Sequence, residues 1–349
     1  MPEDHEYLEI LKANVGFEAA PQRWVPYARR QAFRRVGAEK LRSCPDCDGQ
    51  DVAPIGQYVY YSTLCRLCRC RGCDLVFSDT RLDPTVIAQH FERHYKDESY
   101  FSRQRKTVID QVASIIDTCA GHKASVLDIG GAKGHLMAAL RARRPDLDLT
   151  VNDLSGDACD HARRHFGLRT ISGPLSALQD SGVQYDVIAL IDVMYYEPDL
   201  KALWAVISRR LKTGGVAVIR IPNRSWIVRT SERAKDLCLS THRRSMTARI
   251  SFFNPEHLYV LSRRYLQRPF AQLGFADARF EPARLIAPAP STRLGCSLFF
   301  ALAAGIAAFS GGRIVLTPSQ LITVTKQISP VSTTASGQSD GRFATPMTL

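Results

Sequence analysis

The sequence predicts an α/β fold, in which a mainly parallel sheet carries helices on both faces, preceded by a small cysteine-rich module. From residue 125 onward, apolar segments of strand length alternate with segments of helical periodicity, which is the pattern of a parallel sheet. Six of the ten cysteines crowd into residues 44–73. The chain has 349 residues, 45% of them hydrophobic, which allows roughly two domains of ~100–200 residues and excludes a fibrous or disordered protein.

Length and periodicity assign the elements of this alternation in order along the chain. The predicted strands are Ser125 to Ile129, Leu149 to Asp153, Leu168 to Ser172, Asp186 to Ile191, Val216 to Ile221, Ala276 to Pro282 and Gln320 to Thr325. The predicted helices between the first five strands are Gly134 to Arg144, Asp157 to Phe166, Leu175 to Ser181 and Leu200 to Leu211.

Composition and spacing assign the remaining segments. Residues 1–43 are predicted to form a helical extension, because apolar residues recur there at helical spacing. Linking helices are expected over residues 84–124, the first of them over 84–95. The last twenty residues, 330–349, are rich in Ser, Thr and Gly and are predicted to be disordered.

The sequence shows neither a secretory signal nor a membrane-spanning segment, so we expect a soluble, cytoplasmic protein. The first ten residues carry acids and no apolar core. The longest apolar run, Cys296 to Phe309, has about 14 residues, whereas a spanning helix needs ~20. We expect this run to be a helix that packs on the domain, with a dimer surface or an interfacial membrane anchor as alternatives.

A glycine-rich loop follows the first predicted strand. The segment Val126 to Gly134 passes from an apolar strand through glycines into a helix, a geometry that brings a ligand close to the backbone and a helix N-terminus. The dinucleotide pattern G-x-G-x-x-G is not met, which argues against a nicotinamide enzyme. Asp153 ends the second strand, where a carboxylate can accept from both hydroxyls of a ribose; a helix N-cap is its alternative role.

The ordered motifs together resemble the class I S-adenosylmethionine-dependent methyltransferases. They are the loop Asp128 to Gly134, the acid Asp153, the run Tyr185 to Asn223 and the closing segment Asn254 to Ser262. The resemblance covers about residues 100 to 327 and places the methyltransferase domain at residues 125–329. It implies a Rossmann-like seven-stranded sheet with the last strand antiparallel, and S-adenosyl-L-methionine as cofactor.

The resemblance also implies which residues contact the cofactor. In chain order they are Asp128, Gly130, Ala132 and Gly134 for the methionine portion, Asp153 for the ribose, Gly173 and Leu175 for the adenine, and Asp192 and Val193 near the sulfonium. Ala132 replaces the usual middle glycine of the loop, a change that a negative φ would tolerate. Pro174 stands where many relatives carry an acid for the adenine amine.

The cysteine module, residues 44–83, contains short strand-like segments and paired cysteines. Two C-x-x-C knuckles, Cys44 with Cys47 and Cys70 with Cys73, would satisfy a tetrahedral structural zinc. Spacing alone also permits Cys65 and Cys68 as the second knuckle. The stretch Cys70 to Phe77 resembles the zinc module of a subgroup of these methyltransferases that acts on sugars, which implies Cys44, Cys47, Cys70 and Cys73 as the ligands.

The resemblance to sugar C-methyltransferases places the Glu256-His257 pair at the acceptor site. A base is needed if the acceptor is a hydroxyl or a carbon acid, and histidine suits proton abstraction near neutral pH. Tyr196 is a further catalytic candidate and Tyr195 a substrate-binding one, because both follow the fourth strand. The alternatives are a structural contact for His257 and simple pocket walls for the tyrosines.

The net charge of +12 is concentrated near this pair. Residues 209–268 hold 14 basic and three acidic residues, whereas residues 1–105 are nearly balanced. Arginine pairs with phosphate bidentately. The arginines in this stretch assigned to the acceptor are Arg224, Arg229, Arg243 and Arg244, with Arg249 as a further partner for a diphosphate. A solvated basic face is the alternative role for them.

We therefore expect methyl transfer to an anionic sugar or other small molecule, as a nucleotide-linked or lipid-linked glycan, in natural-product or surface-glycan biosynthesis. One alternative is an RNA methyltransferase with a zinc ribbon. The sequence disfavours nucleic acid, because it lacks an Asn-Pro-Pro-Tyr motif and aromatic residues do not interleave with the basic run. Another alternative is a non-catalytic cofactor-binding module, and peripheral membrane contact is a further option.

Overall fold

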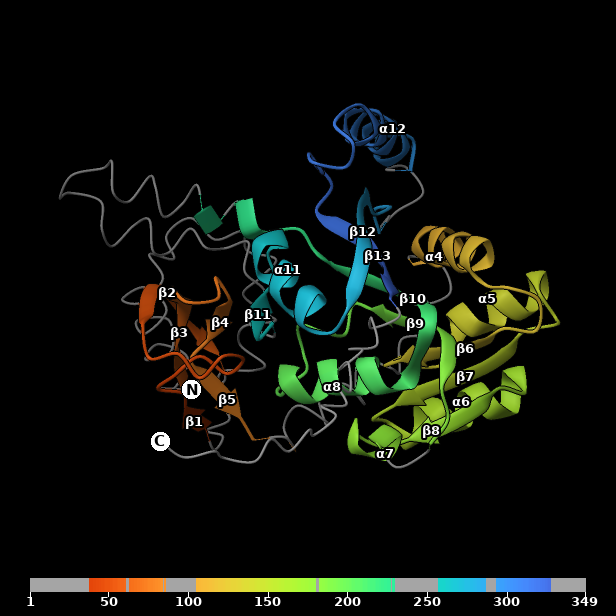
Figure 1. Cartoon of the computed structure of the whole chain (residues 1–349), viewed down its shortest axis with the longest axis horizontal. Coiled ribbons are helices and arrows are strands. Elements are labelled where there is room, and N and C mark those ends of the chain that lie inside the picture. Colours follow the sequence, from red (N-terminus) through yellow and green to blue (C-terminus); the bar gives the residue numbers. More distant parts are fainter. Residues whose placement is uncertain are drawn as a thin grey trace, which may run out of the picture.

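The computed structural model describes residues 38–60, 63–83, 85, 105–179, 182–226, 228–229, 257–286 and 293–327, and a seven-stranded sheet forms its centre (Figure 1). In spatial order the strands are β12 (Phe275–Pro282), β13 (Ser319–Lys326), β10 (Leu211–Pro222), β9 (Tyr185–Ile191), β6 (Ser125–Ile129), β7 (Asp148–Asp153) and β8 (Arg169–Ser172).

The sheet confirms the predicted strands and their directions. The five strands from β10 to β8 are mutually parallel, and β13 runs antiparallel between β10 and β12. The element bounds agree with the sequence to within a few residues, with one exception. Strand β10 begins at Leu211 rather than Val216, because Leu211 already pairs with Tyr185 ahead of an irregularity in the ladder.

Helices cover both faces of this sheet. They are α4 (Lys106–Cys119), α5 (His135–Arg143), α6 (Gly156–Phe166), α7 (Ser176–Gln179), α8 (Leu200–Arg210) and α11 (Arg263–Gln272). Alternate residues of each strand enter different cores: Val126 packs with α4 and α5, while Leu127 packs with α8 and α11. Strands buried on both faces explain why the sequence reads as continuous apolar runs.

The cysteine module forms two small sheets. Strands β2 (Val52–Tyr60), β3 (Thr63–Cys70) and β4 (Val76–Ser78) make an antiparallel sheet, and β1 (Ala38–Lys40) pairs with β5 (Thr80–Leu82). The helical extension expected over residues 1–43 is therefore corrected for residues 38–40, whose backbone pairs with β5 instead. Residues 1–37, most of the predicted linking helix over 84–95 and the tail 330–349 lie outside the described residues.

A strand from the C-terminal half completes the larger of these two sheets. Strand β11 (Tyr259–Val260) pairs antiparallel with β4, giving the order β11-β4-β3-β2. Next to it, the backbone N–H of Leu258 donates to the carbonyl oxygen of Tyr195 at 2.8 Å, and the carbonyl oxygen of Leu258 accepts from the N–H of Ser78 at 2.8 Å. This short segment therefore joins the cysteine module to the main sheet.

The cysteine module and the main sheet also share one core. Leu75 and Phe77 of the module belong to the same buried cluster as Trp204 of α8 and Tyr265 of α11. The Tyr259 hydroxyl accepts from Nη2 of Arg81 at 2.8 Å and donates to the carbonyl oxygen of Pro198 at 2.8 Å. Apolar burial and a buried hydroxyl thus fix the module against the loop that follows β9.

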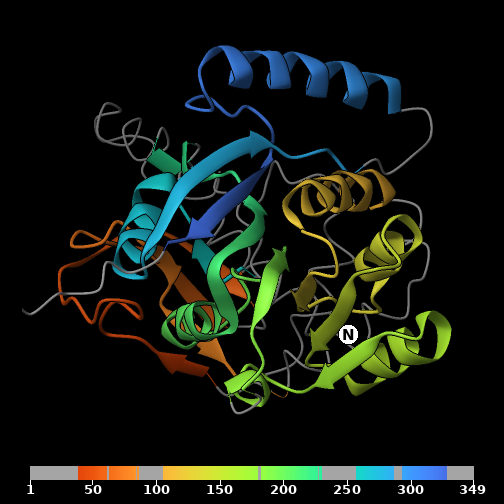
Figure 2. The same ribbon diagram turned by 45° about the vertical axis from the view of Figure 1, so that its right-hand side comes forward.

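A last helix, α12 (Arg293–Phe309), follows β12 and precedes β13 in sequence. It lies at the outer edge of the molecule (Figures 1 and 2). Among the residues of α12 whose burial is described, Ala303 and Ala307 are the buried ones, so the expected packing on the domain centres on small residues. Among the helices that the structure describes, none is long and apolar enough to cross a bilayer.

Candidate functional site

Three carboxylates meet at one edge of the main sheet. Asp128, Asp153 and Asp192 lie at or directly after the carboxyl ends of β6, β7 and β9, which are neighbours in the sheet. Parallel strands present these ends at the same edge, where ligands of open α/β sheets bind. The structure therefore brings together the acids that the sequence assigns to the cofactor.

The glycine loop is held tightly against the strand next to it. Gly130 has a φ of +68°, and a Cβ there would lie 2.5 Å from Cγ2 of Val193. Gly134 has a φ of +80°, and its Cβ would lie 2.8 Å from Leu168 and 2.9 Å from Ala162. Since real Cβ atoms do not approach so closely, only glycine allows the loop to approach β9 and α6 in this way.

Ala132 departs from the expectation of a negative φ. Its φ is +49°, in the left-handed region that glycine adopts readily and other residues adopt at a cost of roughly 1–2 kcal/mol. The residue is held there because its N–H donates to Oδ2 of Asp153 at 2.8 Å. The loop therefore keeps the backbone conformation of its middle glycine despite the added methyl group.

Asp153 anchors this loop from the end of β7. Its Oδ2 accepts from the N–H of Ala132 at 2.8 Å, and its Oδ1 accepts from the N–H of Ser155 at 2.9 Å. The N-cap of α6 is Ser155 rather than Asp153. The Ser155 hydroxyl accepts a hydrogen bond from the N–H of Ala158 in the first turn of the helix.

Asp128 and Asp192 each leave one buried oxygen, Oδ1, without a hydrogen-bond partner among the described residues. Burial and the nearby Asp153 raise the pKa of Asp128 to about 8. Asp192, with a φ of +63°, forms ion pairs through its other oxygen with Arg105 and Arg220. A buried carboxyl oxygen without a partner fits a cationic ligand group such as an ammonium or sulfonium.

The sequence does not predict the two arginines of this cluster. Arg220 gives a signal, because it is the one charged residue in the apolar part of β10 and its side chain is 4% exposed. Arg105 gives none, since it lies in a basic run at the start of α4 and reaches Asp192 only through the fold.

The assigned adenine residues follow the next strand of the sheet. The N–H of Gly173 donates to the carbonyl oxygen of Asp153 at 2.9 Å, and its own carbonyl oxygen accepts from Nδ2 of Asn152 at 3.2 Å. Leu175 is half-buried beside it. The residues present therefore fit the expected cofactor: two acids that each leave one buried oxygen without a hydrogen-bond partner among the described residues, Asp153 at the position expected for the diol, and an apolar edge after β8.

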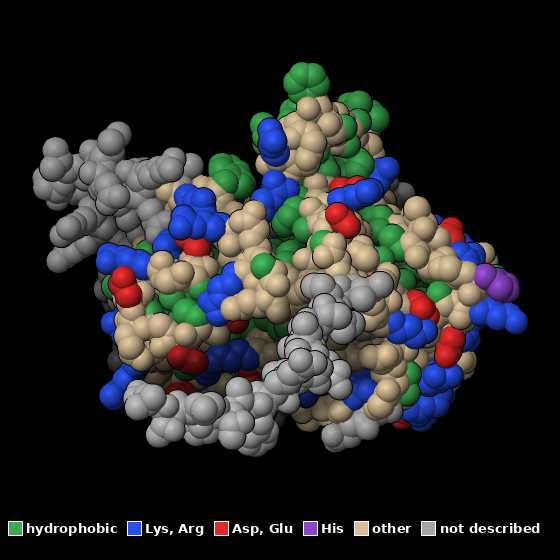
Figure 3. All heavy atoms as spheres, viewed as in Figure 1, with side chains coloured by type: hydrophobic (Ala, Val, Ile, Leu, Met, Phe, Trp, Pro, Cys, Tyr) green, Lys and Arg blue, Asp and Glu red, His purple; other side chains and the backbone are tan. Residues whose placement is uncertain are grey.

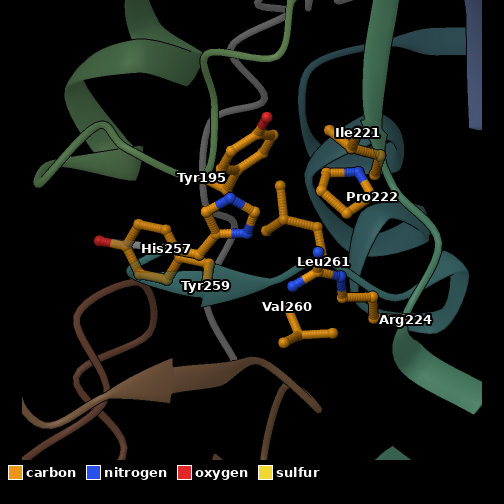
Figure 4. Close-up of a pocket in the computed structure, with 8 residues that line it drawn as sticks. All are labelled: Tyr195, Ile221, Pro222, Arg224, His257, Tyr259, Val260 and Leu261. Carbon is orange, nitrogen blue, oxygen red and sulfur yellow. The ribbon is translucent and has the colours of Figure 1, made fainter. Parts of the chain in front are cut away.

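A separate pocket lies beyond the ends of β9 and β10, against β11 (Figure 4). Its lining is mostly apolar and aromatic, with one arginine and one histidine: Tyr195, Ile221, Pro222, Arg224, His257, Tyr259, Val260 and Leu261. The pocket therefore sits where the main sheet meets the cysteine module, because β11 belongs to the sheet of that module.

His257 lies in this pocket against two tyrosines. Its ring is 4.1 Å from that of Tyr195 and 5.3 Å from that of Tyr196, measured between centroids. Burial, and next the charge of Arg224, hold the pKa of His257 well below its ordinary 6.5, so the imidazole is neutral at pH 7. Its predicted neighbour in catalysis, Glu256, lies outside the described residues.

Arg224 is the predicted substrate arginine that reaches the pocket. Its guanidinium end points toward His257 (Figure 4), and burial lowers the pKa of the group. Its Nη1 is buried and has no hydrogen-bond partner within the described part of the chain. Arg229 is engaged elsewhere, with Oδ2 of Asp74 at 2.7 Å. Arg243, Arg244 and Arg249 lie outside the described residues.

Four cysteine sulfurs form a cluster in the N-terminal module. The Sγ atoms of Cys44, Cys47, Cys70 and Cys73 all lie within 4.8 Å of one another, and a tetrahedral metal requires such an arrangement. The structure thus selects the knuckle pair that the resemblance implies. Within the described residues, Cys65 and Cys68 are not part of this cluster.

Restoring glycine in the loop gives a test of its conformation. We expect Ala132→Gly to raise the free energy of unfolding by about 0.5–1 kcal/mol, since the relieved φ strain exceeds the added entropy of the unfolded chain. Urea denaturation measures this change. Ala139→Gly, in the interior of α5, is the control and should lose about 1 kcal/mol. Equal losses in both variants would contradict the assigned strain.

Comparisons with known proteins agree with this geometry. A family model described as a methyltransferase domain matches residues 100–279. Ribosomal RNA small subunit methyltransferase C of Enterobacter sp. (strain 638) is 27% identical over 147 residues, which are 40% of this chain and 42% of that protein. The chain thus spans less than half the length of this relative.

Solved structures with a similar arrangement include two methyltransferases of low identity. A TehB-like SAM-dependent methyltransferase from Corynebacterium glutamicum is 17% identical, with a TM-score of 0.43, covering 70% of this chain and all of the other. A putative methyltransferase of Haloferax volcanii, solved with the Trm112 activator, is 16% identical, with a TM-score of 0.46, covering 69% and 97%.

The family match extends over more than half of the chain and contains the structural features described above. Residues 100–279 include the glycine loop, the three acids and the pocket around His257. The sheet order, with one antiparallel strand between β10 and β12, is the arrangement that the resemblance implies. The chain belongs to the methyltransferase domain family and is a class I S-adenosylmethionine-dependent methyltransferase.

Proposed function

We propose that this enzyme methylates a phosphate-bearing sugar or other small molecule, such as a nucleotide-linked or lipid-linked glycan. The observation that carries the proposal is the buried Nη1 of Arg224, which has no hydrogen-bond partner among the described residues and lies in a pocket beside His257. A buried guanidinium nitrogen without a hydrogen-bond partner is costly, and an anion in the pocket would supply that partner.

The neutral imidazole of His257 suits the role of base in this reaction. The cofactor supplies an electrophilic methyl group on a sulfonium. The sulfur would keep the electron pair of its bond to the methyl carbon as the acceptor oxygen or carbon takes up that methyl group. The acceptor proton passes to a ring nitrogen of His257. Tyr195 and Tyr196 wall the histidine and fix its ring, so that positioning contributes to the rate.

We further propose that Cys44, Cys47, Cys70 and Cys73 hold a structural zinc ion. Four thiolates complete a tetrahedral site and leave no open position for catalysis. Cys70 and Cys73 immediately precede β4, which pairs with β11 of the acceptor pocket. The metal would therefore act on the acceptor pocket by holding β4 in place.

RNA is the second candidate acceptor. It is favoured by one observation, namely that the curated relative is a ribosomal RNA methyltransferase. A transfer assay with labelled cofactor against nucleotide sugars, lipid-linked glycans and RNA separates the two candidates. Labelling of RNA alone would overturn the proposed acceptor while leaving the methyltransferase family unaffected.

Removing the charge of Arg224 tests the anionic acceptor. We expect Arg224→Met to raise the KM for a phosphate-bearing acceptor about 10- to 100-fold, because one charged hydrogen bond is worth about 1.5–3 kcal/mol. The dissociation constant of the cofactor, measured by calorimetry, should stay the same. Arg209→Met is the matched control, since Arg209 is an exposed residue of the same basic stretch. An unchanged KM in the Arg224 variant would contradict the proposal.

Replacing His257 tests the base. We expect His257→Gln to lower kcat about 10²- to 10⁴-fold with cofactor affinity unchanged. Because the folded-state pKa lies below 6.5, the wild-type imidazole stays neutral as the pH falls through 7 and 6.5, and kcat/KM declines only at more acidic pH. The pH profile of the wild type and the kcat of the variant check this. Full turnover in the variant would exclude His257 as the base.

Metal analysis and chelation test the zinc site. We expect about one zinc per chain, and loss of metal together with weaker acceptor binding in Cys44→Ser. Cofactor binding should be less affected, because the glycine loop and Asp153 lie on the main sheet. Cys68→Ser is the control for the alternative knuckle and should retain its metal. Fewer than about half a zinc per purified chain would contradict the site.

A further inference from the structure

Helix α12 buries two alanines and exposes most of its large apolar residues. Ala303 and Ala307 are 1% and 4% exposed, whereas Leu298 and Leu302 are each 63% exposed and Phe309 is 97% exposed. A surface helix that only packs on its own domain shows the opposite arrangement, with large apolar side chains turned inward. The outer side of α12 is therefore built to contact something other than the sheet beneath it.

The exposed residues form one continuous band. We name the set Leu294, Leu298, Phe299, Leu302 and Phe309 the apolar stripe. Spacings of four between its leucines place them on one face of the helix. Ile314 and Leu316, about half exposed, extend the same region beyond the helix. Figure 3 shows these apolar side chains gathered over α12 at the edge of the molecule.

The border of the stripe carries a net positive charge. Residues 275–318, which span β12, α12 and the loops beside them, hold four basic residues and two acidic ones; the basic residues are Arg279, Arg284, Arg293 and Arg313, and the acidic ones are Asp277 and Glu281 of β12. The guanidinium carbon of Arg284 lies 4.5 Å from the ring centroid of Phe300, so that this cation sits directly beside α12. An apolar band with a cationic border complements a surface that is apolar inside and anionic at its rim.

We propose that α12 is an interfacial anchor, which binds the enzyme to the surface of a bilayer that contains anionic phospholipids. The helix has 17 residues and does not meet the length for crossing the bilayer, so it would lie in the plane of the interface with the apolar stripe buried. A second copy of the chain fits less well, because pairing two such surfaces would bring their cationic borders together. The proposal does not depend on which acceptor the enzyme methylates.

Sedimentation with lipid vesicles tests the anchor. We expect the full-length protein to bind vesicles of phosphatidylcholine and phosphatidylglycerol at least about 10-fold more tightly than vesicles of phosphatidylcholine alone. The combined variant Leu298→Ser, Leu302→Ser and Phe309→Ser should bind the anionic vesicles at least about 100-fold more weakly, since three apolar side chains no longer enter the interface.

A control variant tests whether any exposed apolar side chain contributes to vesicle binding, or only those of the apolar stripe. Val183 is 43% exposed in the loop between α7 and β9, and Val183→Ser should bind vesicles as the wild type does. Cofactor affinity and the thermal melting curve establish that the triple variant is folded, because the stripe contacts neither the cofactor site nor the core.

Three results would overturn the anchor. The first is failure of the wild-type protein to bind anionic vesicles, and the second is equal binding by the triple variant. The third is a concentration-dependent dimer, seen by analytical ultracentrifugation, that the same three substitutions dissociate, since this would assign the stripe to a second copy of the chain.

Discussion

The pairing of β11 with β4 is the constraint on which the pocket around His257 depends. Strand β11 lies between β10 and β12 of the main sheet in sequence but belongs to the sheet of the cysteine module in space. Both backbone groups of Leu258 are used in this connection, one toward Tyr195 and one toward Ser78. The position of His257 is therefore set from two sides, by the loop after β9 and by a module far away in sequence. A change in either sheet therefore moves His257 relative to the edge of the main sheet that carries Asp128, Asp153 and Asp192.

Much of this structure could be predicted from the sequence because its signals are local. Apolar runs between helical segments give the seven strands, and a glycine loop with Asp153 gives the edge at which they bind ligand. The ion pairs of Asp192 with Arg105 and of Arg229 with Asp74 could not be predicted, since each joins residues far apart in the chain. The left-handed φ of Ala132 likewise follows from the hydrogen bond of its N–H to Asp153, which sequence spacing does not show.

The choice between the two cysteine knuckles has a simple geometric cause. Cys65, Cys68 and Cys70 all belong to strand β3, which rises about 3.3 Å per residue. Cys65 is therefore roughly 16 Å along the strand from Cys70, beyond the reach of one metal ion, whereas Cys68 lies only about 7 Å from Cys70 but is not part of the sulfur cluster among the described residues. Cys70 stands at the end of the strand, where the chain turns and brings Cys73 back toward Cys44 and Cys47. The spacing of the cysteines in the sequence permits either Cys65 with Cys68 or Cys70 with Cys73 as the second knuckle, because spacing alone does not show where strand β3 ends.

The segment that carries α12 is inserted between two strands that are paired with each other, β12 and β13. The N–H of Ala283 donates to the carbonyl oxygen of Ser319 at 3.2 Å, so the segment carrying the helix leaves the sheet and returns to it at neighbouring points. Strands β12 and β13 are already adjacent and would remain paired with a short turn in its place. Lengthening such a loop costs little closure entropy. Replacing the helix by a short turn would thus leave the pairing of β12 with β13, and the main sheet, intact.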